Sequence, residues 1–168
     1  MIENAEKSMK GESNRSLEQI YRSAVSGLYS RLRSNYDFIY QKFGDDGLEI
    51  ISEMSHQYGL DIAKRAKNRL DKRDLESITS FILRIFETMT WGRNDTGLTE
   101  LTKTRAVIRA DHCPLNFKDP KMCLAHTTME KTVVEELNQD LKYSIGKSIP
   151  AGDGYCEHII EVKSVKRT

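Results

Sequence analysis

The sequence lacks any apolar run of the roughly 18 residues that a membrane-spanning helix needs, so we expect a soluble chain without a membrane partner. Residues 1–15 contain no apolar stretch of the kind found in secretory signals, which predicts a cytoplasmic location. The 26 basic and 25 acidic residues leave a formal net charge of +1. This balance gives no basic field for a nucleic-acid partner. Three cysteines are too few for a disulfide framework.

The short motifs that identify common enzyme classes are absent as well. The sequence has no GxGxxG or Walker A phosphate loop, no HExxH zinc motif and no GxSxG nucleophile motif. No C-x-x-C pair occurs, so the spacing does not match a zinc finger or a zinc ribbon. Any chemistry must therefore come from the few cysteine and histidine residues.

The first half of the chain has the apolar spacing of amphipathic helices. Residues 1–15 are polar and aperiodic, and we expect them to form a disordered lead-in. Ser16 begins a capping-box pattern at the start of the helical part. The spacing predicts three helices, over about residues 16–44, 45–70 and 71–92. Gly59 falls inside the second helix and is expected to bend or split it.

The pattern changes in the second half. Residues 98–110 are rich in Thr, Val and Ile and predict one strand. Asp119-Pro120 predicts the start of a helix that runs to about Leu137. Residues 141–149 and 155–163 alternate in polarity and predict a β-hairpin.

This order predicts one α+β domain over residues 16–168, after the lead-in of residues 1–15. Long N-terminal helices, over residues 16–92, pack on a C-terminal antiparallel sheet with one intervening helix. The strand–helix–hairpin part covers residues 98–163.

All three cysteines and three of the four histidines lie between residues 112 and 158. Cys113 follows the end of the first predicted strand. Cys123 and His126 are three residues apart on a predicted helix and share a face. Cys156 and His158 are two apart on a predicted strand and point to the same side. A single pocket between these elements can therefore collect all of them.

Three interpretations of these residues remain open. The first is packing, because free cysteine behaves as a small buried hydrophobe. The second is a zinc or iron site, because thiolate and imidazole suit both metals. Its ligands would be drawn from Cys113, Cys123, His126, Cys156 and His158. The third is a thiol-dependent small-molecule site, in which a histidine lowers the pKa of a cysteine or relays protons.

Asp153 lies in a Gly-Asp-Gly turn between the two predicted hairpin strands. Glycine and aspartate are ordinary residues of such turns. The functional interpretation places Asp153 beside Cys156 at the mouth of the pocket, as a polar anchor or an acid–base group.

The last third of the chain also resembles two related families. The matching segments are Ala110–Pro114, Met122-Cys123, Leu141–Tyr143, Ser148–Pro150 and Gly152–Cys156. They are similar to motifs of the L-2-amino-thiazoline-4-carboxylic acid hydrolase-like family and of the 4-vinyl reductase type of domain. The resemblance covers about residues 98–163. It implies the α+β ligand-binding fold shared with nitric-oxide-signalling and Golgi-transport domains. It also implies site positions at Cys113, Cys123, Asp153 and Cys156.

His158 departs from this pattern, because members often carry an aromatic residue at that position. The resemblance implies a small-molecule hydrolase that opens a cyclic thiazoline at a C–N bond. Cys156 and Cys113 would serve as nucleophile or as ligands of a water-activating metal. His158 would be the general base or a metal ligand, and Asp153 would orient the substrate amine.

Two other functions remain open beside the hydrolase. The first is a non-catalytic sensor or carrier that binds a small hydrophobic ligand, a tetrapyrrole-like molecule or a metal ion. In that case the long N-terminal helices would form the interface of a homodimer. The second is a pure interaction module, in which the cysteines serve packing alone.

Overall fold

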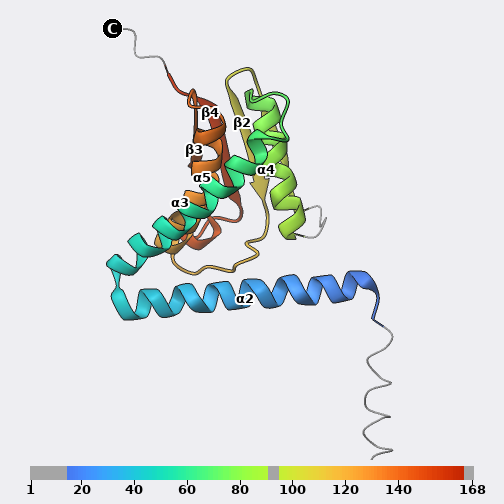
Figure 1. Cartoon of the computed structure of the whole chain (residues 1–168). Helices are drawn as coiled ribbons and strands as arrows, with labels where there is room; N and C mark the ends of the chain where they lie inside the picture. Colours follow the sequence, from blue (N-terminus) through green and yellow to red (C-terminus); the bar gives the residue numbers. More distant parts are fainter. Residues whose placement is uncertain (1–14, 91–94, 165–168) are drawn as a thin grey trace, which may run out of the picture.

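The computed structural model describes residues 15–90 and 95–164, so the predicted disorder of residues 1–14 lies outside the described residues. The chain forms α2 (Leu17–Phe43), α3 (Asp45–Lys67), α4 (Leu75–Thr90), β1 (Thr96–Leu101), β2 (Arg105–Ala110), α5 (Pro120–Leu137), β3 (Leu141–Ile145), the short 3-10 helix η1 (Ile149–Ala151) and β4 (Cys156–Val162). Figure 1 shows α2 running along one side of the molecule, with α3 leading from its end back to the rest of the fold.

The four strands form one antiparallel sheet in the order β1-β2-β4-β3, which confirms the predicted α+β class. One face of this sheet is apolar and carries fully buried Ala106, Ile108 and Ile160 against α4 and α5. The predicted strand over residues 141–149 is shorter than expected. It ends at Ile145 because the chain turns into η1, which begins just before Pro150.

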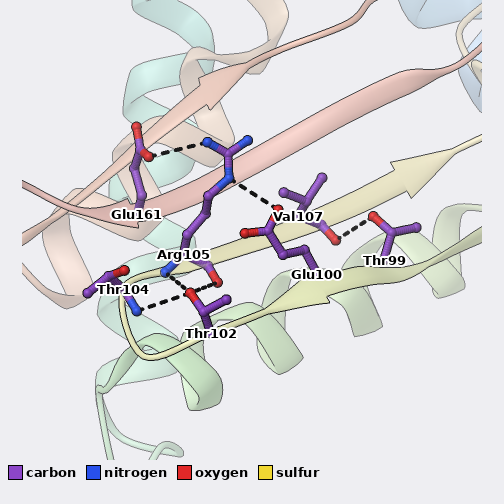
Figure 2. Close-up of polar contacts among 7 residues, drawn as sticks. All are labelled: Thr99, Glu100, Thr102, Thr104, Arg105, Val107 and Glu161. Carbon is purple, nitrogen blue, oxygen red and sulfur yellow. Dashed lines mark hydrogen bonds and ion pairs between the residues drawn. The ribbon is translucent and has the colours of Figure 1, made fainter.

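The expectation of a single strand over residues 98–110 is wrong, because the chain reverses there into the hairpin β1–β2. The Oγ1 atom of Thr102 accepts hydrogen bonds from the backbone N–H groups of Thr104 and Arg105, at 3.3 and 3.0 Å (Figure 2). The side chain of a threonine thus stabilises a turn of the kind that usually contains glycine or asparagine. The pairing of β1 with β2 also shifts register between Leu98 and Glu100, as a β-bulge does.

The other face of the sheet carries charged side chains beside the buried side chains of Val107 and Ile159. The guanidinium group of Arg105 lies 3.4 Å from Glu100 on β1 and 3.7 Å from Glu161 on β4 (Figure 2). Glu161 also pairs with Lys142 on β3 at 3.0 Å. Ion pairs among these side chains link all four strands. The helices pack on the opposite, apolar face of the sheet.

Gly59 allows α3 and α5 to approach closely, and α3 continues through it as one helix, so the expected split does not occur. A Cβ atom at this position would lie 2.8 Å from the carbonyl oxygen of Met129 and 2.8 Å from Cβ of Thr132. The missing side chain therefore serves packing between helices. It does not mark a break in the helix.

The capping box at Ser16 is present, and Gly44 ends α2 with a φ of 61°, which favours glycine. The two halves of α2 differ in burial. Tyr36 in the C-terminal half is 5% exposed, whereas Leu17 and Leu28 in the N-terminal half are 83% and 67% exposed. Within the described ranges, no helix is both long enough and apolar enough to cross a lipid bilayer.

Candidate functional site

A cavity of about 710 Å³ lies among the four helices, and we call it the helix cavity. Apolar and aromatic side chains dominate its lining, to which α2, α3, α4 and α5 all contribute. The lining residues are Tyr29, Leu32, Tyr36, Met54, Ser55, Tyr58, Ile62, Arg65, Ala66, Arg69, Phe81, Ile85, Thr88, Met89, His126 and Met129. Its two charged residues, Arg65 and Arg69, are exposed.

A second cavity, of about 70 Å³, lies between α4, α5, the sheet and the segment that follows β2, and we call it the thiol cavity. Its lining residues are Phe86, Met89, Thr96, Ala110, His112, Cys113, Pro114, Leu115, Phe117, Cys123, His126, Thr127, Glu130, Cys156 and His158. Met89 and His126 line both cavities, so these two side chains form the boundary between them.

The structure brings the candidate cysteines together. Cys113, Cys123 and Cys156 all line the thiol cavity, together with His126 and His158. They reach it from three places in the chain: the segment after β2, one face of α5, and the start of β4. The helical spacing of three and the strand spacing of two place the paired side chains as expected.

Asp153 does not line the thiol cavity. It is exposed, and its carboxylate accepts a hydrogen bond of 2.8 Å from the backbone N–H of Ser148. The backbone N–H of Asp153 in turn donates to the carbonyl oxygen of Ser148 at 3.2 Å. Asp153 thus closes the turn around η1, which is the structural role of aspartate in such turns.

Two of the three histidines that line the thiol cavity, His126 and His158, are uncharged at neutral pH. Burial lowers the pKa of His126 to about 4, and burial together with the nearby His126 lowers that of His158 to about 4. Nδ1 of His126 lies 3.3 Å from the hydroxyl of Tyr36, and Nδ1 of His158 lies 2.5 Å from the hydroxyl of Tyr143. Each imidazole therefore has one nitrogen engaged by a tyrosine.

Two of the thiols are held in the protonated form. Burial raises the pKa of Cys123 to about 11, and the neighbouring Cys113 and Cys156 add to the increase. Burial also raises the pKa of Cys156, although the backbone N–H of Ile149 donates to its sulfur at 3.3 Å and opposes the shift. A protonated thiol is a weak nucleophile and a poor metal ligand.

The donor set does not fit a metal ion in this arrangement. Over residues 15–90 and 95–164, no three His, Cys, Asp or Glu side chains stand close enough to one another to hold one. The predicted zinc or iron ligands therefore share a cavity without forming a coordination sphere.

Glu130 on α5 is a residue that the sequence reasoning missed. Its side chain is 3% exposed, and burial raises the pKa of its carboxyl group to about 7. Oε2 of Glu130 has no hydrogen-bond partner among the described residues. The signal was present in the sequence, because Glu130 follows His126 by four residues and Cys123 by seven. All three therefore lie on one face of the helix.

No family profile and no curated protein sequence matches the chain. Solved structures with a similar fold include a trafficking protein particle complex subunit 3 from Naegleria fowleri, covalently bound to palmitic acid. That structure aligns with a TM-score of 0.60 and 16% identity, over 83% of this chain and 98% of the other. An H-NOX domain from Shewanella oneidensis in its Fe(II)CO ligation state aligns with a TM-score of 0.52 and 14% identity, over 81% of this chain and 76% of the other. At such low identity the similarity establishes the fold and nothing finer.

Proposed function

We propose that this chain is a sensor or carrier domain that holds a small hydrophobic ligand in the helix cavity. The observation that carries this proposal is the cavity itself. Its volume of about 710 Å³ lies within the range of roughly 300–1,000 Å³ that is typical of small-molecule sites. The fold adds support, because the Naegleria fowleri subunit that shares it is bound to palmitic acid.

The electrostatics of the helix cavity also favour an apolar occupant. The pKa of Tyr29 is raised to about 12, and burial is the largest cause of this increase. The hydroxyl group of Tyr29 therefore stays uncharged. His126 is uncharged as well, because its pKa is about 4. Arg65 and Arg69 are the charged lining residues, and both are exposed. An apolar chain can therefore enter without burying a charge, which is the costly step in ligand binding.

Titration calorimetry with decan-1-ol tests this proposal. We expect the chain to bind this uncharged ten-carbon probe, and we expect Ile85→Trp to weaken binding at least about tenfold by filling the cavity. The matched control is Leu124→Trp, which changes a leucine that is 59% exposed on α5 and lines neither cavity. Failure of the unchanged chain to bind decan-1-ol, or equal binding by Ile85→Trp, would refute the proposal.

A second candidate is the thiazoline-type hydrolase, favoured by the gathering of three thiols and three imidazoles in the thiol cavity. It has weaker support than ligand binding. Burial keeps Cys156 protonated, and Nδ1 of His158 is engaged by Tyr143. The test is turnover of 2-amino-thiazoline-4-carboxylate by the unchanged chain and by Cys113→Ser and Cys156→Ser. Full turnover in both variants would exclude the cysteine mechanism.

The homodimer also belongs among the proposals. Leu17, Ile20 and Leu28 are exposed and lie at helical spacing on the N-terminal half of α2. A second copy of the chain would cover this apolar face. Of the two solved structures compared, the trafficking subunit is part of a complex, which is consistent with a protein partner for this fold.

A further inference from the structure

The thiol cavity contains a carboxyl group that the binding of a purely apolar ligand does not explain. Glu130 is 3% exposed, and its Oε2 accepts no hydrogen bond from any residue that the structure describes. Leaving a buried acceptor unpaired is costly, and for a charged acceptor the cost is greater. A polar atom in this state points to a partner that is bound from outside the chain.

The charges around Glu130 indicate the sign of the charge that this partner carries. No lysine or arginine is among the residues that line the thiol cavity. His126 and His158 are uncharged near neutral pH, and the thiols of Cys123 and Cys156 are protonated. The third histidine of the lining, His112, is 68% exposed and lies 3.4 Å from Asp95. Once ionised, Glu130 therefore has no buried counter-charge in the lining. A cation that also donates hydrogen bonds would supply one.

We propose that the thiol cavity binds the protonated amine head group of a ligand whose apolar part lies in the helix cavity, with Glu130 as the acceptor. This inference rests on the proposed function, because it assigns the polar end of the same ligand. A volume of about 70 Å³ admits a group of a few heavy atoms, which suits an ammonium group.

The two cavities are placed to share one ligand. Met89 and His126 line both, so the apolar space and the space at Glu130 adjoin at one methionine and one imidazole. A methionine side chain has three rotatable bonds and adapts to its neighbours at little cost. In this proposal, a change in the side-chain conformation of Met89 opens the passage between the cavities.

The arginines of the helix cavity favour the opposite head group, and the test must separate the two. Arg65 and Arg69 would attract a carboxylate. Both are exposed, so water and salt screen their charge. Glu130 is enclosed, and interactions with an enclosed charge are screened much less. The structure therefore favours an amine over a carboxylate.

The test compares three ligands of equal chain length, decylamine, decan-1-ol and decanoic acid, by titration calorimetry of the full chain at pH 8. We expect decylamine to bind about tenfold tighter than decan-1-ol. A gain of this size corresponds to one charge-assisted hydrogen bond, here from the ammonium group to Glu130. In Glu130→Gln, the preference for decylamine over decan-1-ol should disappear. The matched control is Glu136→Gln, a surface position on the same helix that pairs with Lys67. This control should preserve the preference for the amine.

The outcomes separate this inference from the proposed function. If decan-1-ol does not bind at all, the helix cavity is not a ligand site, and both proposals fail. If decan-1-ol binds but decylamine binds no tighter, or if decanoic acid binds tightest and Glu130→Gln changes nothing, only the amine inference is overturned. Methyl NMR gives a second readout, because Met89 lines both cavities and Met129 lines only the helix cavity. Decylamine should shift the Met89 signal in the unchanged chain more than in Glu130→Gln.

Discussion

The hydroxyl group of Tyr143 lies 2.5 Å from Nδ1 of His158, so β3 fixes an imidazole on the neighbouring strand β4. The ring of Phe86 on α4 packs against the same imidazole, with 4.5 Å between the ring centroids. The histidine is thereby held between the sheet and a helix. Burial in this position, together with the nearby His126, lowers its pKa to about 4.

The two enclosed histidines should make the folded state sensitive to acid. The pKa values of His126 and His158 are about 4, against 6.5 for an ordinary histidine. Between these two pH values, the two histidines bind more protons in the unfolded chain than in the folded chain. Their contribution to stability is therefore complete above pH 6.5 and is lost as the pH falls toward 4. At about 1.4 kcal/mol per pKa unit, each contributes up to about 3 kcal/mol.

Urea unfolding of the chain and of His126→Gln, from pH 7.5 down to pH 5, measures this effect. We expect the variant to lose less stability than the unchanged chain over that range. An equal loss in both proteins would mean that His126 is not held in its uncharged form.

Glu130 should have the opposite effect on stability. The pKa of its carboxyl group is raised to about 7 from 4.5, so the folded chain binds more protons between these values. Its contribution is complete below pH 4.5 and is lost as the pH rises through 7. We therefore expect Glu130→Gln to be more stable than the unchanged chain above pH 7, by up to about 3 kcal/mol.

The quantity to measure is the difference in unfolding free energy between Glu130→Gln and the unchanged chain at pH 5 and pH 8. The histidines contribute equally to both proteins and cancel in this difference. Glu136→Gln, which changes an exposed carboxylate, should show no such trend. A difference that does not grow with pH would contradict the burial of an unpaired carboxyl group.

Gly59 should not tolerate a side chain. In Gly59→Ala the new Cβ would meet the carbonyl oxygen of Met129 at 2.8 Å, so α3 and α5 must separate. We expect a loss of about 1–3 kcal/mol, as for other overpacked positions. Gly27 is the matched control, because a Cβ there would meet nothing within 4 Å. Gly27→Ala should stabilise α2 by about 0.5–1 kcal/mol. Guanidinium unfolding of both variants checks the pair.

The exposed face of α2 gives a prediction about oligomeric state. If Leu17, Ile20 and Leu28 form the interface of a dimer, Leu28→Lys should convert a dimer into a monomer of 19.3 kDa. Light scattering coupled to size-exclusion chromatography measures the mass directly. Leu124→Lys, on the exposed side of α5, should leave the dimer intact. A monomeric unchanged chain would rule out this interface.

The helices were predictable because their boundaries depend on local chemistry. Ser16, Gly44 and Asp119 end or begin helices through their own side chains or backbone conformation, and the sequence shows them directly. The β1–β2 hairpin was missed because its turn depends on the hydroxyl group of Thr102. Threonine favours strands as well as such turns, so its position alone does not separate the two.

The candidate site was predictable only in part. The spacing of Cys123 and His126, and of Cys156 and His158, placed each pair on one side of its element. Whether the two elements face the same space depends on the packing of α5 on the sheet, which local spacing does not determine. Asp153 was expected at the mouth of the pocket. Whether its turn points toward the pocket does not follow from the sequence.

The bulge between Leu98 and Glu100 has a consequence for self-assembly, because β1 is an outer strand of the sheet. An outer strand with an irregular register presents a poor template for amyloid-like growth. At the opposite margin, β3 is only five residues long and carries the charged Lys142. Continuous sheets between molecules are therefore disfavoured at both margins.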